Sequence, residues 1–245
     1  MSVTEVIVVL AVAAIAALVK STTGMGYPLV LIPVLALFIN IADAVVIIAP
    51  SNLYLNASLA WNVRRHRHQA RTLRRFVGGG LVGAATGAVM LASLPERALR
   101  LLLVGVIVLF VLNRLLGERT DVSSGLAARL AAPVGAVAGF FQGASGISGP
   151  IVSPWFLSLG LTRDTYVFCI TSVFACTGGM QMFIFGVHGT FTVKLLLLGL
   201  ALIPIALVAM PVGMRLRQRL PVHMFENAVV LLLVGSAVSI VIRLI

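Results

Sequence analysis

The sequence predicts an all-α polytopic membrane protein made of two inverted repeats of about five helical segments each, with a short, broken second helix in each repeat. The first supporting observation is composition: of 245 residues, 60% are hydrophobic and 10% are charged, and the mean hydropathy is +1.11. Soluble globular domains carry about 25% charged residues. The second is that the charges lie between long apolar runs, and the third is that one glycine- and serine-rich interruption occurs twice.

Apolar runs separated by short polar segments indicate the helices of each half. The expected helices span about 3–20, 26–39, 42–63, 73–93 and 96–116, then about 128–142, 148–160, 164–186, 192–214 and 222–243. The second and seventh are shorter than the roughly 20 residues of a full crossing, so we expect each to form a re-entrant or half-helix hairpin with the helix before it. The predicted organisation is a first repeat over 1–116, a polar cytoplasmic linker over 117–127 and a second repeat over 128–245.

The two halves can be aligned with each other. The equivalent pairs are Gly24 and Gly146, Pro28 and Pro150, Lys20 and Gln142 and, after a one-residue shift, Asp43 and Asp164. One unit used twice explains this correspondence.

Positive charge changes sides between the halves. Six arginines lie within 64–75, after the third segment, whereas the equivalent loop at 186–190 has no Lys or Arg. The loop after the ninth segment is basic instead, at 215–219. Basic loops are cytoplasmic under the positive-inside rule, which puts both termini outside and gives the halves opposite orientations, although Arg100 and Lys194 fall on the wrong side. Inverted repeats of this kind are typical of secondary transporters.

Each interruption predicts a break in a helix with free backbone donors. The residues expected at the two breaks are Ser21, Thr22, Gly24 and Gly26 in the first half, and Ser145, Gly146, Ser148 and Gly149 in the second. Unwound backbone at membrane depth has to be buried in protein or face water. Because the helix that follows each break points its N-terminus into the gap, we expect an oxyanion site shared by the repeats. Close packing of small residues is the alternative.

Polar side chains of the third and eighth segments lie at similar depth. Asn52 and Asn56 are four residues apart and share a helix face, and the eighth segment offers Thr171, Ser172 and Thr177. Such groups usually face the interior of a bundle, where they contact substrate or form interhelical hydrogen bonds.

The charged residues near the breaks leave alternatives open. Lys20 precedes the first break, where it would neutralise an anion or extend to the membrane interface. Gln142, its counterpart, carries no charge, so the site would be asymmetric. Asp43 and Asp164 begin the third and eighth segments; helix capping is favoured for them over proton coupling.

Several function classes are excluded. The net charge of +11 does not indicate a nucleic-acid partner, because the arginines lack interleaved aromatic residues and there is no room for a soluble binding domain. We find no nucleophile–base pair, no paired carboxylates and no Cys/His cluster with metal spacing, so we expect no enzyme, no cofactor and no metal. The expected partners are a small anionic substrate and membrane lipid, with a homodimer as an open alternative to a monomer.

The twice-used break followed by Pro resembles that of the sulfite exporter TauE/SafE family of membrane transporters. The resemblance covers nearly the whole chain and is carried by Gly24-Met25-Gly26-Tyr27-Pro28 and Gly146-Ile147-Ser148-Gly149-Pro150, the short helix after each, and the Asp that begins the next. The family pattern is usually richer in Gly. The resemblance implies a multi-pass secondary transporter of the inner or plasma membrane that exports a small oxyanion, such as sulfite, a sulfonate such as sulfoacetate or a related organic anion, with proton coupling as one option. A passive anion channel is the main alternative; an intramembrane enzyme and a membrane scaffold are the others.

Overall fold

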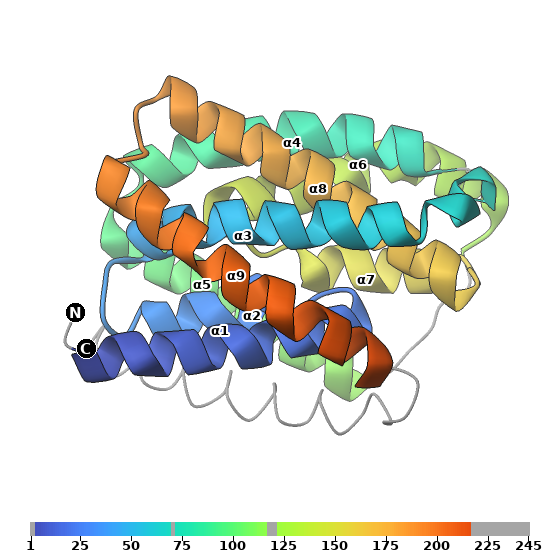
Figure 1. The fold of residues 1–245 in the computed structure, drawn as a ribbon. Coiled ribbons are helices and arrows are strands. Elements are labelled where there is room, and N and C mark those ends of the chain that lie inside the picture. Colours follow the sequence, from blue (N-terminus) through green and yellow to red (C-terminus); the bar gives the residue numbers. More distant parts are fainter. Residues whose placement is uncertain (1–2, 70–71, 117–121, 217–245) are drawn as a thin grey trace.

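The computed structural model describes residues 3–69, 72–116 and 122–216, and every regular element in these ranges is a helix (Figure 1). The α-helices are α1 (Val3–Thr23), α2 (Tyr27–Leu35), α3 (Ile41–Asn62), α4 (Leu73–Ser93), α5 (Glu96–Leu116), α6 (Ser124–Ser145), α7 (Gly149–Leu157), α8 (Arg163–Val187) and α9 (Val193–Leu216), and a 3-10 helix, η1, spans Arg64–Gln69. The all-α prediction is confirmed. The segment expected at 222–243 lies outside the described residues.

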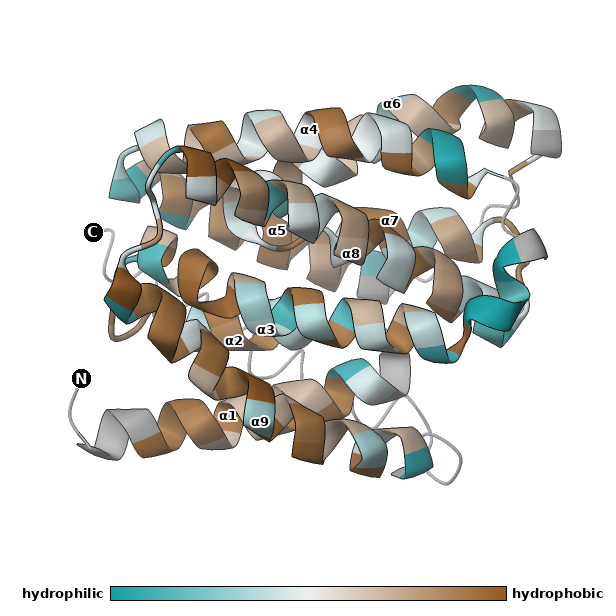
Figure 2. Ribbon diagram, turned by 45° about the horizontal axis from the view of Figure 1, so that its top comes forward, coloured by the Kyte–Doolittle hydropathy of each residue, from teal (hydrophilic) through white to brown (hydrophobic). Residues whose placement is uncertain are grey.

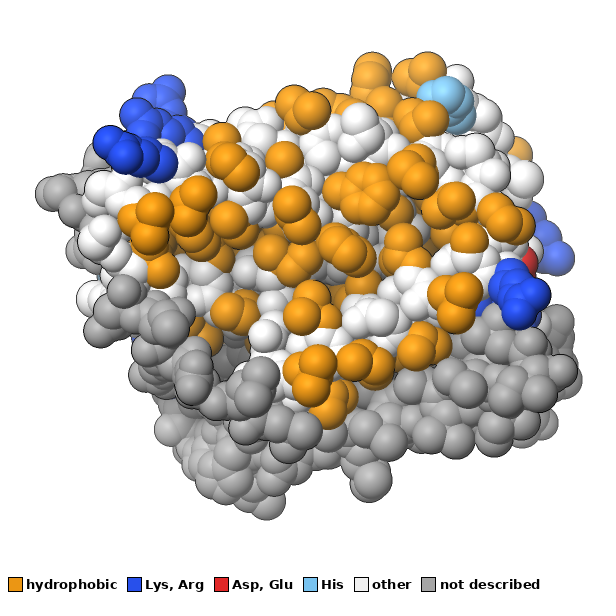
Figure 3. Space-filling view, turned by 180° about the vertical axis from the view of Figure 1, so that it is seen from behind, with side chains coloured by type: hydrophobic (Ala, Val, Ile, Leu, Met, Phe, Trp, Pro, Cys, Tyr) orange, Lys and Arg blue, Asp and Glu red, His pale blue; other side chains and the backbone are white. Residues whose placement is uncertain are grey.

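Within the described ranges, α3, α4, α6, α8 and α9 contain stretches long and apolar enough to cross a membrane. Figure 2 shows hydrophobic residues along the bodies of these helices and hydrophilic residues gathered at their ends, above all in η1. On the rear face, hydrophobic side chains spread across the middle and Lys and Arg lie at the edges (Figure 3). This distribution suits an apolar belt in contact with lipid.

The helices before the two breaks are longer than predicted. α1 continues to Thr23 and α6 to Ser145, so Ser21, Thr22 and Ser145 are helical and the unwound segments are only 24–26 and 146–148. Both helices end at a glycine in the left-handed region, Gly24 at φ 85° and Gly146 at φ 72°. Serine and threonine are compatible with the last helical turn, whereas a positive φ favours Gly; the glycines, not the hydroxyl residues, therefore end the helices.

Helices α4 and α6 are packed backbone to backbone through glycine, an interface that our sequence analysis did not identify. A Cβ added at Gly79, Gly83 or Gly87 of α4 would overlap the carbonyl oxygen of Ala132, Ala136 or Phe140 of α6. The reverse holds for Gly135, Gly139 and Gly143 of α6, against Phe76, Gly80 and Ala84. The contacts advance in the same direction along both helices, so the pair is parallel. Small residues allow this approach in membranes, where dispersion contacts take over from the hydrophobic effect.

The second such pair is α1 with α9, which also run in the same direction (Figure 1). The α1 positions equivalent to Gly135, Gly139 and Gly143 under the repeat alignment are Ala13, Ala17 and Ser21, all of them buried. Gly213 of α9 lies against this stripe, where an added Cβ would approach the Ser21 Cβ atom to 2.6 Å. Each half of the chain thus packs one helix against a helix of the other half.

Two hydrophobic clusters meet at the breaks. The first joins α1, α2 and α3 with α5 and α9, and the second joins α6, α7 and α8 with Phe76 of α4. Met25, in the first break, packs against both clusters. The central helices α3 and α8 lie in contact and run in opposite directions (Figure 1), so the breaks are enclosed by helices of both halves.

The α4–α6 contact predicts a large effect of one added methyl group. Gly83→Ala should lower the free energy of unfolding by about 1–3 kcal/mol, because the helices have to separate to admit the Cβ. Gly105→Ala in α5 is the matched control, since nothing lies within 4 Å of the added atom; it should be neutral or stabilising by up to about 1 kcal/mol. Thermal unfolding in detergent measures both, and equal melting temperatures for the two variants would contradict the close approach.

Candidate functional site

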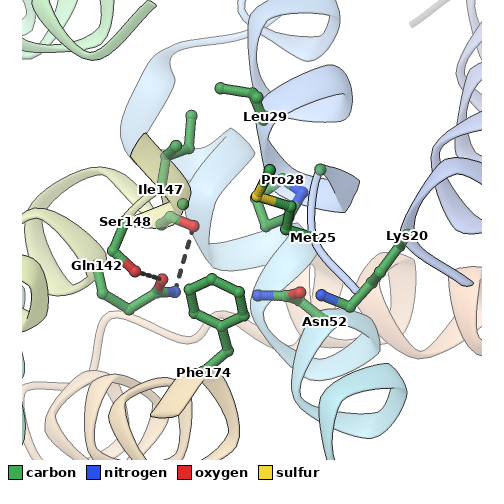
Figure 4. A pocket seen from close by; sticks show the side chains of 12 residues that line it. Lys20, Met25, Pro28, Leu29, Asn52, Gln142, Ile147, Ser148 and Phe174 are labelled. Atoms are coloured by element: carbon green, nitrogen blue, oxygen red, sulfur yellow. Dashed lines mark hydrogen bonds between the residues drawn. The ribbon is translucent and has the colours of Figure 1, made fainter. Parts of the chain in front are cut away.

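A cavity lies between the two breaks, where the two hydrophobic clusters meet (Figure 4). The cavity is small and partly open at its mouth. Its lining comes from both halves of the chain and consists of Lys20, Met25, Gly26, Pro28, Leu29 and Asn52, and of Gln142, Gly146, Ile147, Ser148, Gly149 and Phe174. The expectation that the two breaks lie together is met in this cavity.

The breaks reach the cavity because each packs against helices of the other half. A Cβ at Gly24 would come within 2.7 Å of Ile170 Cδ1, on α8. A Cβ at Gly146 would come within 2.9 Å of Ile32 Cδ1, on α2, and 3.5 Å of Val45 Cγ1, on α3. Val45 lies on α3 and Val167, near Gly24, lies on α8, and these two helices are equivalent under the repeat alignment. The two turns are therefore held by reciprocal contacts.

Two nine-residue helices begin at the edge of this cavity. Gly26 precedes α2 and Ser148 precedes α7, and each helix has a Pro at its start, Pro28 and Pro150. Proline at this position has no N–H to leave unpaired and has a φ suited to the first turn. The positive ends of two helix dipoles consequently lie on the same space.

Lys20 is buried at one side of the cavity. Its side chain is 1% exposed, and its Nζ atom lies 5.4 Å from the centre of the Phe174 ring. Ion pairs join His66 to Asp164 and Glu96 to Arg100, and Lys20 has no carboxylate partner among the described residues. The burial of the Lys20 side chain favours a lysine that faces the cavity over one that extends to the membrane interface. A buried cation is costly unless an anion pairs with it.

Gln142 and Ser148 form a network within the second break. Ser148 Oγ donates to Gln142 Oε1 at 2.8 Å, and Gln142 Nε2 donates to the carbonyl of Gly146 at 3.2 Å (Figure 4). From α8, Gln181 Nε2 donates to the carbonyls of Gln142 and Gly143 at 2.9 and 3.0 Å. These bonds fix the end of α6. They also engage the Gln142 amide and the Ser148 hydroxyl within the protein, although both residues line the cavity.

Asn52 presents an amide to the cavity and Asn56 supports it from one turn away. Asn56 Nδ2 donates to Asn52 Oδ1 at 3.1 Å, as the shared face of the sequence pattern predicts. Asn52 Nδ2 has no hydrogen-bond partner among the described residues and lies on the cavity. In the view of Figure 4 the Lys20 ammonium appears next to the Asn52 amide, whose nitrogen is on the side of the Phe174 ring. Asn56 Oδ1 is buried and unpaired in the described structure.

Several other residues predicted for the site do not line the cavity. Ser21, Ser145, Thr171 and Thr177 donate their hydroxyls to carbonyls four residues earlier, at 2.6–2.8 Å. Such bonds to the preceding turn satisfy the hydroxyl within its own helix. Ser172 is half-buried and also lies outside the lining; the side chain of Thr22 is not among those described.

Asp43 and Asp164 lie away from the cavity at helix starts. The Asn40 side chain caps α3 by accepting from Asp43 N–H at 2.7 Å, and it donates to Asp43 Oδ2 at 2.8 Å. Asp164 is half exposed in the first turn of α8, and its Oδ2 atom lies 3.7 Å from His66 Nε2. Both aspartates are therefore placed where a helix dipole favours a negative charge.

The residues that the sequence analysis missed are the apolar part of the lining. Met25, Pro28, Leu29, Ile147 and Phe174 are ordinary hydrophobic residues of a membrane protein, and nothing in their spacing distinguishes them. For Met25 and Ile147 there was one signal: they stand inside the breaks, at equivalent positions.

The groups that line the cavity are suited to binding. The part of the chain that the structure describes holds no group of three or more His, Cys, Asp or Glu residues that would bind a metal. The cavity offers one cation, one free amide donor and two helix N-termini. These groups suit a small anion.

The comparisons with known proteins give one match. The family model described as "Sulfite exporter TauE/SafE" matches residues 9–240. Comparison with curated proteins and with solved structures finds no match.

The geometry of the second break predicts that alanine destabilises the protein more at Gly146 than at Gly160. Gly146→Ala should cost about 1–2 kcal/mol for the left-handed backbone and more for the clash with Ile32. Gly160→Ala, at φ 62° with nothing within 4 Å of the added atom, should show the backbone cost alone. Melting temperatures in detergent report both, and a smaller loss at Gly146 than at Gly160 would contradict the described packing of the break.

Proposed function

The chain belongs to the sulfite exporter TauE/SafE family, and from that premise we propose that it exports a small oxyanion through the cavity between the two breaks. Proteins of this family are membrane transporters and not enzymes, and this chain is a multi-pass protein of the cell membrane. The substrate we propose is sulfite, a sulfonate such as sulfoacetate or a related organic anion. The mechanism we propose is secondary transport.

The observation that carries the proposal is the burial of Lys20 beside the cavity with no carboxylate partner among the described residues. An ion pair with an entering anion would offset the desolvation of the ammonium. Asn52 Nδ2 would donate to the same anion, and the N-termini of α2 and α7 would add two favourable dipoles.

Two further features support movement of one half against the other. The helix pairs α4–α6 and α1–α9 are equivalent under the repeat alignment, as are the contacts of Gly24 and Gly146 with the opposite half. Inverted repeats around a central site allow the site to open alternately to each side. In our proposal, residues 1–116 and 128–245 are such repeats. Each break contacts the opposite repeat, so a movement of one repeat against the other would move both breaks.

Proton coupling would require a carboxylate whose surroundings change during transport. Of Asp43 and Asp164, we favour Asp164, because its contact with His66 joins η1 of the first half to α8 of the second. Asp43 is already engaged by the α3 cap.

Replacement of Lys20 by Met should remove the charge and reduce anion binding by roughly 10- to 100-fold, the value of one hydrogen bond to a charged group. Lys194→Met is the matched control, since Lys194 is exposed at the start of α9 and is not part of the lining; this variant should transport normally. Counterflow of radiolabelled sulfite and sulfoacetate in proteoliposomes is the measurement.

Equal flux through the Lys20→Met and Lys194→Met proteins would refute the role of this cavity. Unitary currents in planar bilayers, with flux that does not saturate, would instead favour a passive anion channel. Folded protein that moves neither of these anions nor any other small organic anion would leave the scaffold alternative.

A further inference from the structure

The wall of the cavity is apolar over most of its extent. Met25, Leu29 and Ile147 face the same space as the ring of Phe174, and Pro28 completes this side. Leu29, Ile147 and Phe174 are 2–5% exposed, so the wall is fixed in the hydrophobic clusters and is not a lipid-facing surface. A bare inorganic oxyanion has no apolar part to place against it.

Free side-chain donors are few. Among the described lining residues, Lys20 Nζ and Asn52 Nδ2 have no hydrogen-bond partner, whereas the Gln142 amide N–H and the Ser148 hydroxyl are used within the protein. Three backbone N–H groups of the breaks are also engaged: those of Gly24 and Gly146 donate to the preceding helix turns, and that of Ile147 donates to Ser145 Oγ. An anion that leaves water has to regain hydrogen bonds on every oxygen, which is hardest for a small dianion.

The formal charge of the lining is that of one lysine. No other Lys, Arg, Asp or Glu is among the lining residues that the structure describes. A second negative charge on the ligand would enter a largely apolar space with no counterion, and this is strongly unfavourable. One cation therefore matches a monoanion.

We propose that the substrate is an organic monoanion with a short apolar substituent, whose charged head binds Lys20 and Asn52 and whose tail packs against Met25, Leu29 and Phe174. This inference rests on the proposed export function and narrows its substrate class away from inorganic sulfite and from dianions such as sulfoacetate. The arrangement in Figure 4 fits it: Lys20 and Asn52 meet at the lower side of the cavity, and Met25 and Leu29 lie above them.

Met25 sets the room available to the tail. Its Sδ atom lies 3.5 Å from the position that a Cβ of Gly149 would occupy, so it fills the space between the two breaks. It is partly exposed, and as an unbranched thioether it can change rotamer at little cost. A side chain here decides how long a substituent the cavity accepts, which makes Met25 a specificity-determining residue.

The test uses the unbranched alkanesulfonates from methane- to butanesulfonate, which stay singly charged and do not cross the bilayer as neutral acids. Each is measured as a competitor of labelled ethanesulfonate counterflow in proteoliposomes containing the full chain. We expect apparent affinity to rise about fourfold per added methylene until the cavity is full, the value of burying one CH₂. Inorganic sulfite, tested at an alkaline pH at which it carries two charges, and sulfoacetate should compete more weakly than ethanesulfonate.

Met25→Ala tests the wall itself. It should reduce the affinity gain for the tail and allow longer sulfonates to compete, while methanesulfonate competes as before. Met90→Ala is the matched control, because Met90 is exposed on α4 and lies outside the lining; its affinity series should match that of the unmodified protein. A series unchanged by Met25→Ala would overturn the role given to Met25.

The two proposals fail in different ways. If sulfite or sulfoacetate competes better than every alkanesulfonate, and transport still requires Lys20, the inference about the substrate is overturned and the proposed export function stands. An apparent affinity that does not change with the length of the alkyl group would also overturn the inference about the substrate and leave the proposed export function standing. If folded protein transports none of these anions, the proposed function fails, and the inference fails with it.

Discussion

A lysine ammonium buried beside a cavity, with no carboxylate to pair with among the described residues, is the constraint on which the rest of this structure depends. Removal of that charge from water is unfavourable, so the fold has to supply compensation. Within the protein, the face of the Phe174 ring on α8 is attractive to this cation, whereas the N-termini of α2 and α7 add positive potential to the same space. The ammonium, the Asn52 amide N–H and the two helix N-termini all favour an anion, so an anion that enters the cavity would supply the missing compensation, and this is why a costly residue can be useful in a transporter.

Helices of the two halves approach one another closely. Glycine at every contact allows α4 and α6 to pack backbone to backbone, whereas the equivalent α1 stripe has alanine and serine. Such packing makes each half dependent on a helix of the other half. A relative movement of the halves would then displace both breaks together, since each break also contacts the opposite half.

Most hydroxyl groups near the breaks have a structural role. Ser21, Ser145, Thr171 and Thr177 each bond to a carbonyl of the preceding turn, and these bonds remove exposed donors from the helix surface. What remains for a ligand is sparse: one ammonium, one amide, a few backbone N–H groups and an apolar wall. A site with few donors binds a poorly hydrated anion better than a strongly hydrated one, because less hydration has to be replaced.

The sequence by itself determined the all-α class, the bounds of α4 and α5, the two breaks and the family, because these depend on apolar run length, Gly and Pro chemistry and a repeated motif. It also pointed to Lys20, Asn52 and Gln142, whose polarity is conspicuous in an apolar background. Only the tertiary structure decided that Ser21 and Thr171 turn to their own helices, that Lys20 is buried, and that Phe174 and Leu29 line the cavity. The physical reason is that these outcomes depend on which helix faces lie in contact. In a chain that is hydrophobic on nearly every helix face, the local sequence pattern says little about which face of a helix packs against its neighbours.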